Sequence, residues 1–432
     1  MKHSVEAIKL ANGAEGLFVH VPDATVMTFE LNFRAGEYLV EREKWETPHL
    51  MEHILLGANQ NIPKARAFQA EFEKNGAYCN ASTGAYEITY EAECADFEWA
   101  RIIDLLTTAI TKPLFLEEEY KAEFGNVREE LSARSNNHFR HLNLSLREAY
   151  GFLVVTDQER IRLMENVTLN DVRKHYASTH TASNLRFVIA GNIAPKRKRI
   201  LQGLLENIDL PKGEGRLELP IENPKKIIKP LYIENKTVDN IYFYIDTFMK
   251  RRLSEPEADT LALLNTMLTE TLHSNILGTA REKGLVYSMS SGFNQGRGVS
   301  NWWFGAQVMP GNAPALFDVI SKELIRIFEG QLSDEDLKAA KQYSLGKHQR
   351  SEQTVSAVMS GYSGRYFFDG YIDDYYKIPE RIEAVSKDMI VATAKNMFEQ
   401  QVRGFGALGN FGDEFAHKLY DKVLPVWLRS SL

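Results

Sequence analysis

The sequence has few cysteines and no long apolar run. Cys79 and Cys94 are the only two cysteines among 432 residues, too few for a disulfide framework and wrongly spaced for a zinc site made of thiolates. No apolar window reaches the ~18 residues of a membrane helix, and the N-terminal segment lacks the apolar stretch of a signal peptide. We therefore expect a protein of a reducing compartment, the cytoplasm, with no membrane association.

An excess of basic residues is also absent. The chain has 51 lysines and arginines against 58 aspartates and glutamates, and its net charge is -7. A nucleic-acid surface needs clustered positive charge, so we expect no nucleic-acid partner. The one basic run, at residues 196–199, is typical of a solvated helix start. With 44% hydrophobic and 25% charged residues the composition is that of a globular protein, and its length favours two domains.

The two halves of the chain repeat one order of expected elements. The segment FVIAGNI at residues 187–193 is followed 218 residues later by FGALGNF at 405–411. Between the halves, residues 209–230 are rich in proline and glycine, as linkers are. The sequence therefore predicts two duplicated α+β domains, at 1–208 and 231–432, each a mainly antiparallel sheet covered by helices.

Local patterns predict the elements of each half. Alternating β-branched and aromatic residues favour strands within 17–33 and 77–92, and a compact buried strand at 184–192. Helical periodicity indicates helices at 47–56, 64–75, 97–111 and 116–135. In the second half we expect a strand at 240–248, helices over 255–278, strands at 287–293 and 301–307, further helices, and a last strand at 405–411.

The segment HLMEH at residues 49–53 carries the clearest chemical signal. His49 and His53 stand at i and i+4, so on a helix both imidazoles project from one face, close enough to bind one zinc ion. Glu52 lies on the same side, where its carboxylate can touch a zinc-bound water without itself being a ligand. The neighbouring apolar residues predict a buried helix, and burying two histidines and a glutamate is costly unless something binds them.

A catalytic zinc site needs a third protein ligand, and the helix at 116–135 offers candidates. Phe124, Val127 and Leu131 mark its buried stripe, and Glu123 and Glu130 flank that stripe two turns apart on one side. The pattern alone leaves both glutamates as candidates for the third ligand. The helix also carries Glu117, Glu118, Glu119 and Glu129.

HLMEH, followed 77 residues after His53 by Glu130 in EFGNVREEL, resembles the inverted-zincin metallopeptidases of the pitrilysin, insulysin and mitochondrial processing peptidase family. The resemblance implies that His49, His53 and Glu130 bind one Zn²⁺ per chain. It implies that Glu52 is the catalytic base and that Glu123 supports the site without binding the metal. The chain resembles a short, two-domain form of this family.

Two further segments resemble the family. The strand CNAST at 79–83 is similar to its active-site edge strand, in which Asn80 and Ala81 would pair with the substrate backbone. REKGLVY, from Arg281 to Tyr287, resembles its arginine and tyrosine pair, which contacts the substrate carbonyl. Here the two residues are six positions apart instead of the family's usual seven, so a charged strand entry is the alternative interpretation.

The resemblance implies a zinc metalloendopeptidase that hydrolyses peptides or unfolded polypeptides through a zinc-activated water. Family members close two such chains, or two fused halves, into a clamshell, so this chain would form one half. A homodimer is the simpler expectation, and a heterodimer with a related subunit is the alternative. Two other functions stay open: a non-catalytic peptide-binding or assembly subunit, and a metal-binding scaffold without turnover.

Overall fold

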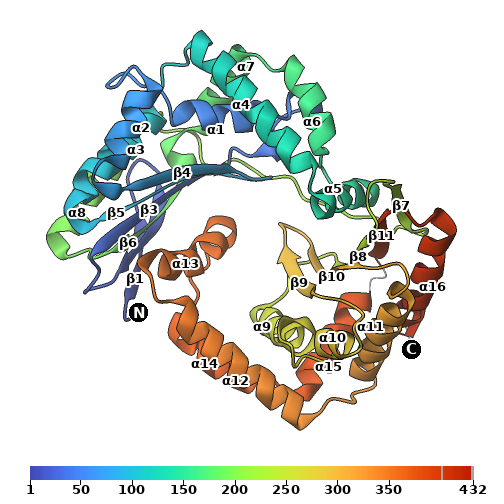
Figure 1. The fold of residues 1–432 in the computed structure, drawn as a ribbon. Helices are drawn as coiled ribbons and strands as arrows, with labels where there is room; N and C mark the ends of the chain where they lie inside the picture. Colours follow the sequence, from blue (N-terminus) through green and yellow to red (C-terminus); the bar gives the residue numbers. More distant parts are fainter. Residues whose placement is uncertain (400–401, 430–432) are drawn as a thin grey trace. The chain divides into compact units, whose positions relative to one another are not determined.

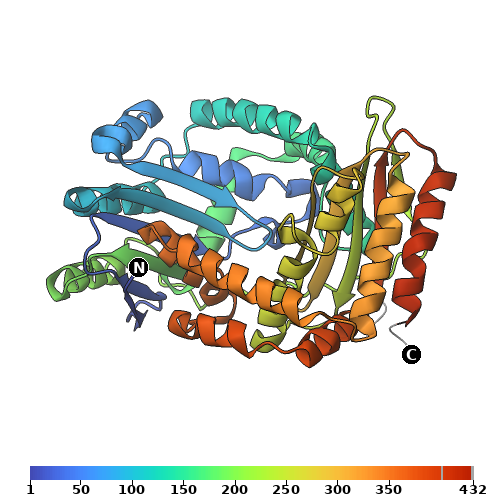
Figure 2. The same cartoon turned by 60° about the horizontal axis from the view of Figure 1, so that its bottom comes forward.

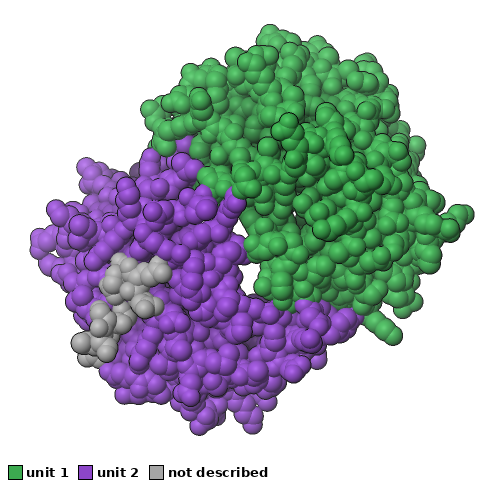
Figure 3. All heavy atoms as spheres, turned by 180° about the vertical axis from the view of Figure 1, so that it is seen from behind, with its two compact units in different colours: residues 1–133, 157–220, 350–373 green, residues 134–156, 221–349, 374–432 purple. Residues whose placement is uncertain are grey.

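The computed structural model describes residues 1–399 and 402–429. They form two compact units, each assembled from three separate segments of the chain (Figure 3). Neither unit is a continuous half of the sequence. Unit 1 consists of Met1–Ala133, Asp157–Pro220 and Arg350–Asp373, and unit 2 of Arg134–Thr156, Ile221–Gln349 and Asp374–Leu432.

Unit 1 is built on a six-stranded sheet with the strand order β1-β2-β6-β3-β5-β4 (Figure 1). β2 and β6 pair in parallel, and the other neighbours pair antiparallel. Every second residue of β3, from Met27 to Phe33, is fully buried against the helices on one face. The strands are β1 (Ser4–Lys9), β2 (Glu15–His20), β3 (Val26–Phe33), β4 (Tyr78–Thr83), β5 (Ile88–Ala95) and β6 (Leu185–Gly191).

Helices cover both faces of this sheet. α13 (Val355–Asp369) contacts β3 and β6 on the face opposite the main helical layer, and its orange ribbon lies beside these strands in Figures 1 and 2. The other helices assigned to unit 1 are α1 (Thr47–Leu55), α2 (Ala65–Glu73), α3 (Trp99–Thr111), α4 (Glu117–Ser135, except its last two residues), α6 (Asp157–Leu163), α7 (Leu169–Thr179) and α8 (Pro195–Glu206).

Unit 2 has a five-stranded sheet with the order β7-β11-β8-β10-β9, in which β7 and β11 are parallel. Its strands are β7 (Leu231–Glu234), β8 (Ile241–Met249), β9 (Met289–Gln295), β10 (Ser300–Val308) and β11 (Val402–Gly409). Its helices are α5 (His138–Tyr150), α9 (Glu255–Asn265), α10 (Leu277–Glu282), α11 (Ala313–Phe328), α12 (Asp334–Ser351, which ends in unit 1), α14 (Ile378–Ala384), α15 (Lys387–Glu399) and α16 (Asp413–Arg429).

The two sheets share one topology. The order β2-β6-β3-β5-β4 of unit 1 matches β7-β11-β8-β10-β9 of unit 2 strand for strand, including the single parallel pair. The repeated strands β6 and β11 both end in a glycine with positive φ, Gly191 at 139° and Gly409 at 154°. A side chain there would collide with neighbouring atoms, which explains the shared glycine. The predicted fold class, two duplicated α+β domains with mainly antiparallel sheets, is confirmed.

One of the boundaries between the units falls between Pro220 and Ile221, inside the expected linker 209–230, which contains no helix or strand. The sequence did not indicate that α5 packs on the sheet of the later unit and α13 on the sheet of the earlier one. That residues 1–208 and 231–432 fold as two domains stays a prediction. No helix among the described residues has both the length and the apolarity to cross a membrane.

The helices expected over 255–278 are present, with a break between them. α9 continues into a π-helix at Thr266–Glu270, and α10 begins only at Leu277. Between them the backbone turns at Thr271, whose carbonyl oxygen accepts hydrogen bonds from the amide and the hydroxyl of Ser274. A serine or threonine that bonds to nearby backbone competes with the helix, which explains the break.

Asp246 is a buried carboxyl group on β8 whose ionisation opposes folding. It accepts hydrogen bonds from Asn301 at 3.2 Å and from the Tyr150 hydroxyl at 3.4 Å, and burial raises its pKa to about 7. Because the folded pKa lies above the ordinary value, the stability that the protonated form provides is lost as the pH rises through 7. Relative to Asp246→Asn, the free energy of unfolding of the wild-type protein should fall by about 2–4 kcal/mol between about pH 5 and pH 8.

Thermal melting of both proteins across this pH range measures the effect. The Asp246→Asn variant should melt higher than the wild type at the alkaline end and close to it at the acidic end. Parallel pH profiles for the two proteins would contradict the prediction.

Candidate functional site

The two motif histidines lie on α1, which packs on the first sheet. Pro48 occupies the first turn, and Leu50, Met51, Ile54 and Leu55 are fully buried. His49 is 4% exposed and His53 is half-buried. Their ring centroids are 5.0 Å apart, as the i, i+4 spacing predicts.

Glu130 reaches both histidines from α4. Its Oε2 atom lies 3.3 Å from His49 Nε2 and 3.6 Å from His53 Nε2. Val127 and Leu131 of α4 are fully buried, which fixes the side of the helix on which Glu130 stands. Among the described residues, His49, His53 and Glu130 form the one group of three or more histidine, cysteine or acidic side chains whose donor atoms could meet at a single ion, all within 4.8 Å.

Each imidazole is held at its other nitrogen by a carboxylate. His53 Nδ1 lies 2.9 Å from Glu123 Oε2, and His49 Nδ1 lies 3.0 Å from Glu46 Oε2. A hydrogen bond at Nδ1 sets the tautomer in which Nε2 carries the lone pair, so both Nε2 atoms are prepared to bind a cation.

The carboxylates and His49 have shifted acidities. The hydrogen bond to His53 lowers the pKa of Glu123 against the opposing effect of burial. Burial alone would raise the pKa of Glu46, but the charge of Arg160 and hydrogen bonds from His49 and Arg160 hold it at about 2. Burial alone would lower the pKa of His49, but hydrogen bonds to Glu130 and Glu46 raise it to about 9. The two carboxylates around His49 thus favour a positive charge here, whether a proton on the ring or a cation at Nε2.

The donor set fits zinc. Two imidazole nitrogens and one carboxylate oxygen are the ligands of many catalytic zinc sites, which leave the fourth position to water. Bond lengths of ~2.0–2.2 Å in a tetrahedron put neighbouring ligand atoms about 3.4 Å apart. The 3.3 and 3.6 Å separations between Glu130 and the two imidazoles are close to that edge length.

Glu52 lies beside this group without being part of it. It is 9% exposed, and Thr83 at the end of β4 donates a hydrogen bond of 2.7 Å from its hydroxyl to Glu52 Oε2. A buried carboxylate held in this way has few orientations available. It is therefore fixed next to, and not among, the three candidate ligands.

The segment CNAST lies on β4, the last strand of the six-stranded sheet. Asn80 is exposed, and its amide nitrogen lies 3.5 Å from Glu91 on β5. Ala81 faces the core and is 8% exposed. Among the described strands β4 pairs only with β5, so its outer edge is open to another strand.

Arg281 and Tyr287 belong to unit 2 and contact each other. The Arg281 guanidinium donates to the backbone oxygen of Tyr287 at 2.6 Å and lies over its ring, 4.9 Å from the centroid. The Tyr287 side chain is 83% exposed. The six-residue spacing therefore still brings these two side chains together. They lie in unit 2, whereas His49 and His53 lie in unit 1.

Sequence comparison assigns both halves of the chain to one family. A family model described as "Insulinase (Peptidase family M16)" matches residues 20–152, and one described as "Peptidase M16 inactive domain" matches residues 166–343. The chain belongs to the M16 peptidase family. His49, His53 and Glu130 lie within the first match, and Arg281 and Tyr287 lie within the second.

Similar proteins match nearly the whole length of this M16 chain. The beta subunit of the mitochondrial-processing peptidase of Saccharomyces cerevisiae is 20% identical over 428 residues, 93% of this chain and 90% of that protein. Among solved structures, an M16 inactive domain from Pseudomonas fluorescens has a TM-score of 0.82 at 16% identity, with 95% of this chain and 98% of that one covered. A protease from Helicobacter pylori has a TM-score of 0.82 at 18% identity, covering 94% and 100%.

These likenesses establish the M16 fold and leave two expectations open. At 16% and 18% identity the solved structures inform on the fold and not on activity. The yeast protein is mitochondrial by name, so a cytoplasmic location for this M16 chain stays a prediction.

The internal repeat of this M16 chain shows which residues of the second unit correspond to the histidine motif of the first. The 218-residue offset places HLMEH on residues 267–271, and Glu270 corresponds to Glu52. The first residues of α4 and α12 are 217 apart, which places Lys347 on Glu130. Lys347 and Glu270 form an ion pair, and Thr266 donates to Glu270 at 3.2 Å. An ammonium group thus neutralises the retained glutamate.

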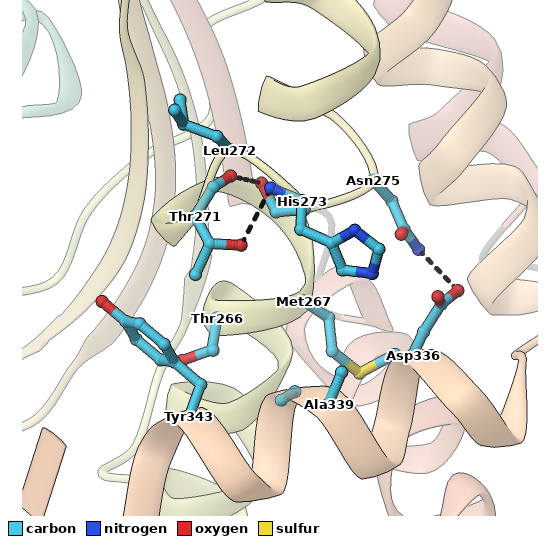
Figure 4. Close-up of a pocket in the computed structure, with 11 residues that line it drawn as sticks. Thr266, Met267, Thr271, Leu272, His273, Asn275, Asp336, Ala339 and Tyr343 are labelled. Atoms are coloured by element: carbon cyan, nitrogen blue, oxygen red, sulfur yellow. Dashed lines mark hydrogen bonds between the residues drawn. The ribbon is translucent and has the colours of Figure 1, made fainter. Parts of the chain in front are cut away.

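A cavity of about 380 Å³ lies next to this ion-paired segment in unit 2 (Figure 4). Met267, Leu272 and Ala340 provide part of its apolar lining. His273 and Asp336 add polar groups, and Asn275 donates to Asp336 at 3.4 Å. These side chains form no three-ligand set of the kind seen in the first unit, within the part of the chain that the structure describes.

Two residues of the first unit were missed by sequence reasoning. Thr83 lies inside CNAST, but its contact with Glu52 depends on how β4 and α1 pack. Glu46 lies three positions before His49, and the helical spacing that relates His49 to Glu52 could have revealed it. The family motif begins at His49, so the resemblance carries no information about an acidic residue before it.

Proposed function

We propose that this M16 chain is a zinc-dependent endopeptidase that hydrolyses peptides or unfolded polypeptides. The observation that carries the proposal is the convergence of His49 Nε2, His53 Nε2 and a Glu130 oxygen within 4.8 Å, with Glu52 fixed beside them. Both imidazoles are oriented by carboxylates at Nδ1, which supports binding of one metal ion.

His49, His53 and Glu130 would hold the ion. Bound zinc supplies a Lewis acid that polarises the peptide carbonyl and makes a water molecule more acidic. Glu52 accepts the proton of the attacking water and passes it to the leaving amine. The Thr83 hydroxyl keeps one Glu52 oxygen engaged and leaves the other available for this proton.

The open edge of β4 would bind the substrate. A peptide added as a further strand would use main-chain hydrogen bonds around Asn80 and Ala81, so side-chain selectivity would be weak. An exposed edge at the end of a folded sheet suits an extended or unfolded chain better than a folded one.

Arg281 and Tyr287 would stabilise the negative charge that develops on the carbonyl oxygen during attack. Their mutual contact supports a joint role, with the exposed Tyr287 ring backed by the guanidinium. We propose that they complete the site of a second copy in a homodimer. The yeast relative is named as one subunit of its peptidase, which makes a heterodimer with a related chain the alternative.

A non-catalytic peptide-binding or assembly subunit is the second candidate function. One similar structure is described as an inactive domain. Against it, this chain retains His49, His53 and Glu130 in one cluster, with Glu52 beside them. A scaffold that only stores metal would not need Glu52, so the proton acceptor favours turnover.

The proposal is tested by digesting a mixed peptide library with the pure protein, with and without a chelator. The protein should contain about one zinc per chain, because three ligands form a prepared site. Cleavage should disappear with the chelator and return on adding zinc. A dialysed sample with no zinc, and no cleavage after zinc is added, would reject the proposal.

Subunit mixing tests the shared site. Glu52→Gln and Arg281→Ala chains are mixed in equal amounts and allowed to exchange, so about half of the dimers contain one chain of each kind. In each mixed dimer one of two sites has an intact zinc half and an intact arginine, so roughly a quarter of wild-type activity should appear from two nearly inactive parents. Activity that stays at the parental level after confirmed exchange would exclude a site shared between copies.

A further inference from the structure

Glu46 occupies an unusual place for a buried carboxylate. It stands at the N-cap position of α1 and is 0% exposed, yet its side chain makes no capping hydrogen bond to the helix. A charged group without solvent needs other partners, because burial of an unpaired carboxylate is strongly unfavourable. The side chain instead turns to His49, where its Oε2 atom lies 3.0 Å from Nδ1.

Arg160 fixes Glu46 from the other side. This arginine lies on α6, is 5% exposed, and donates to both Glu46 oxygens, to Oε2 at 3.1 Å. It also contacts Glu37 at 2.8 Å. A two-point contact between a guanidinium and a carboxylate defines the direction of the carboxylate as well as its place.

We propose that Glu46 is a positioning residue for the metal and that Arg160 holds it in place. The inference rests on the proposed zinc function. Metal binding at Nε2 needs the proton of the neutral imidazole on Nδ1, and Glu46 is the acceptor found for that proton. Glu46 would thus do for the buried His49 what Glu123 does for the half-buried His53.

The two carboxylates differ in what supports them. Glu123 is half-buried on α4, where Asn126 donates to it at 3.1 Å. Glu46 is fully buried and bound by a buried arginine from a different helix. Water can replace part of a half-buried contact but cannot reach the Glu46 contact, so the orientation of His49 should depend more strongly on its carboxylate.

The test compares Glu46→Gln with Glu37→Gln as a matched control. Both variants remove one carboxylate charge from Arg160, but only the first alters the contact with His49. Zinc affinity is measured by competition with a chelator on metal-free protein. Glu46→Gln should bind zinc ~10–100-fold more weakly, and Glu37→Gln should stay within about threefold of the wild type.

The visible absorption of bound Co²⁺ gives a second readout, because it responds to ligand orientation and not to overall stability. Its bands should change in Glu46→Gln and remain as in the wild type in Glu37→Gln. If Glu46→Gln does not fold, Glu46→Asp keeps the charge for Arg160 while it withdraws the carboxylate from Nδ1, and weaker zinc binding is again expected.

Wild-type zinc affinity in a folded Glu46 variant would overturn the inference, and so would an equal loss in both glutamine variants. These outcomes are distinct from failure of the proposed function. That failure would appear in the wild-type protein itself, as absence of zinc binding or of peptide cleavage.

Discussion

Replacing Glu52 with glutamine is expected to lower kcat/KM for peptide cleavage by at least ~100-fold while zinc content and folding stay unchanged. The amide keeps the size of the side chain and can still accept the hydrogen bond of Thr83. It cannot accept a proton from water. The loss should therefore appear in turnover and not in metal content, measured on the same preparation.

Glu129→Gln is the matched control for this substitution. Glu129 is an exposed carboxylate on α4, one residue before Glu130. Its replacement by glutamine removes the same charge, but outside the cluster. This variant should cleave peptides at nearly the wild-type rate. Cleavage by Glu52→Gln at the rate of this control would show that Glu52 is not the proton acceptor.

Substituting His53 with alanine is expected to remove both metal and activity. Two of three ligands remain, and Glu123 loses the imidazole that it contacts. Zinc content should fall from about one per chain to below about a tenth. Zinc should also raise the melting temperature of the wild-type protein and leave that of His53→Ala unchanged, because a ligand stabilises only the state that binds it.

His273→Ala provides the comparison, since this histidine is exposed in unit 2 and lies outside the cluster. That variant should retain zinc, activity and the zinc-dependent rise in melting temperature. A His53→Ala protein that is purified with one zinc and cleaves peptides would contradict the assigned ligand set.

The repeated fold could be predicted because its signals are local or periodic. The strands β6 and β11 both end in a glycine that is followed by an asparagine, and the glycine is required by a backbone conformation that other residues avoid. The exchange of α5 and α13 between the units could not be predicted in this way. Both helices have apolar residues that must be buried, but the pattern does not indicate on which sheet each helix packs.

At the site, too, some features could be predicted from the sequence and others depended on tertiary packing. The separation of His49 and His53 follows from the geometry of a single helix, so the spacing was enough to predict that both rings face one ion. On α4 the spacing left Glu123 and Glu130 equally open from the residues alone. Both stand on the same side of that helix, and family resemblance was needed to separate them.

In the structure, the contacts between α4 and α1 give the two glutamates different positions. They put a Glu130 oxygen opposite the two Nε2 atoms and a Glu123 oxygen at His53 Nδ1. Packing of α6 likewise brought Arg160 to Glu46, 114 residues away in the chain. Spacing within one helix is set by its backbone hydrogen bonds, whereas contacts between helices depend on how buried side chains interlock, which no local pattern records.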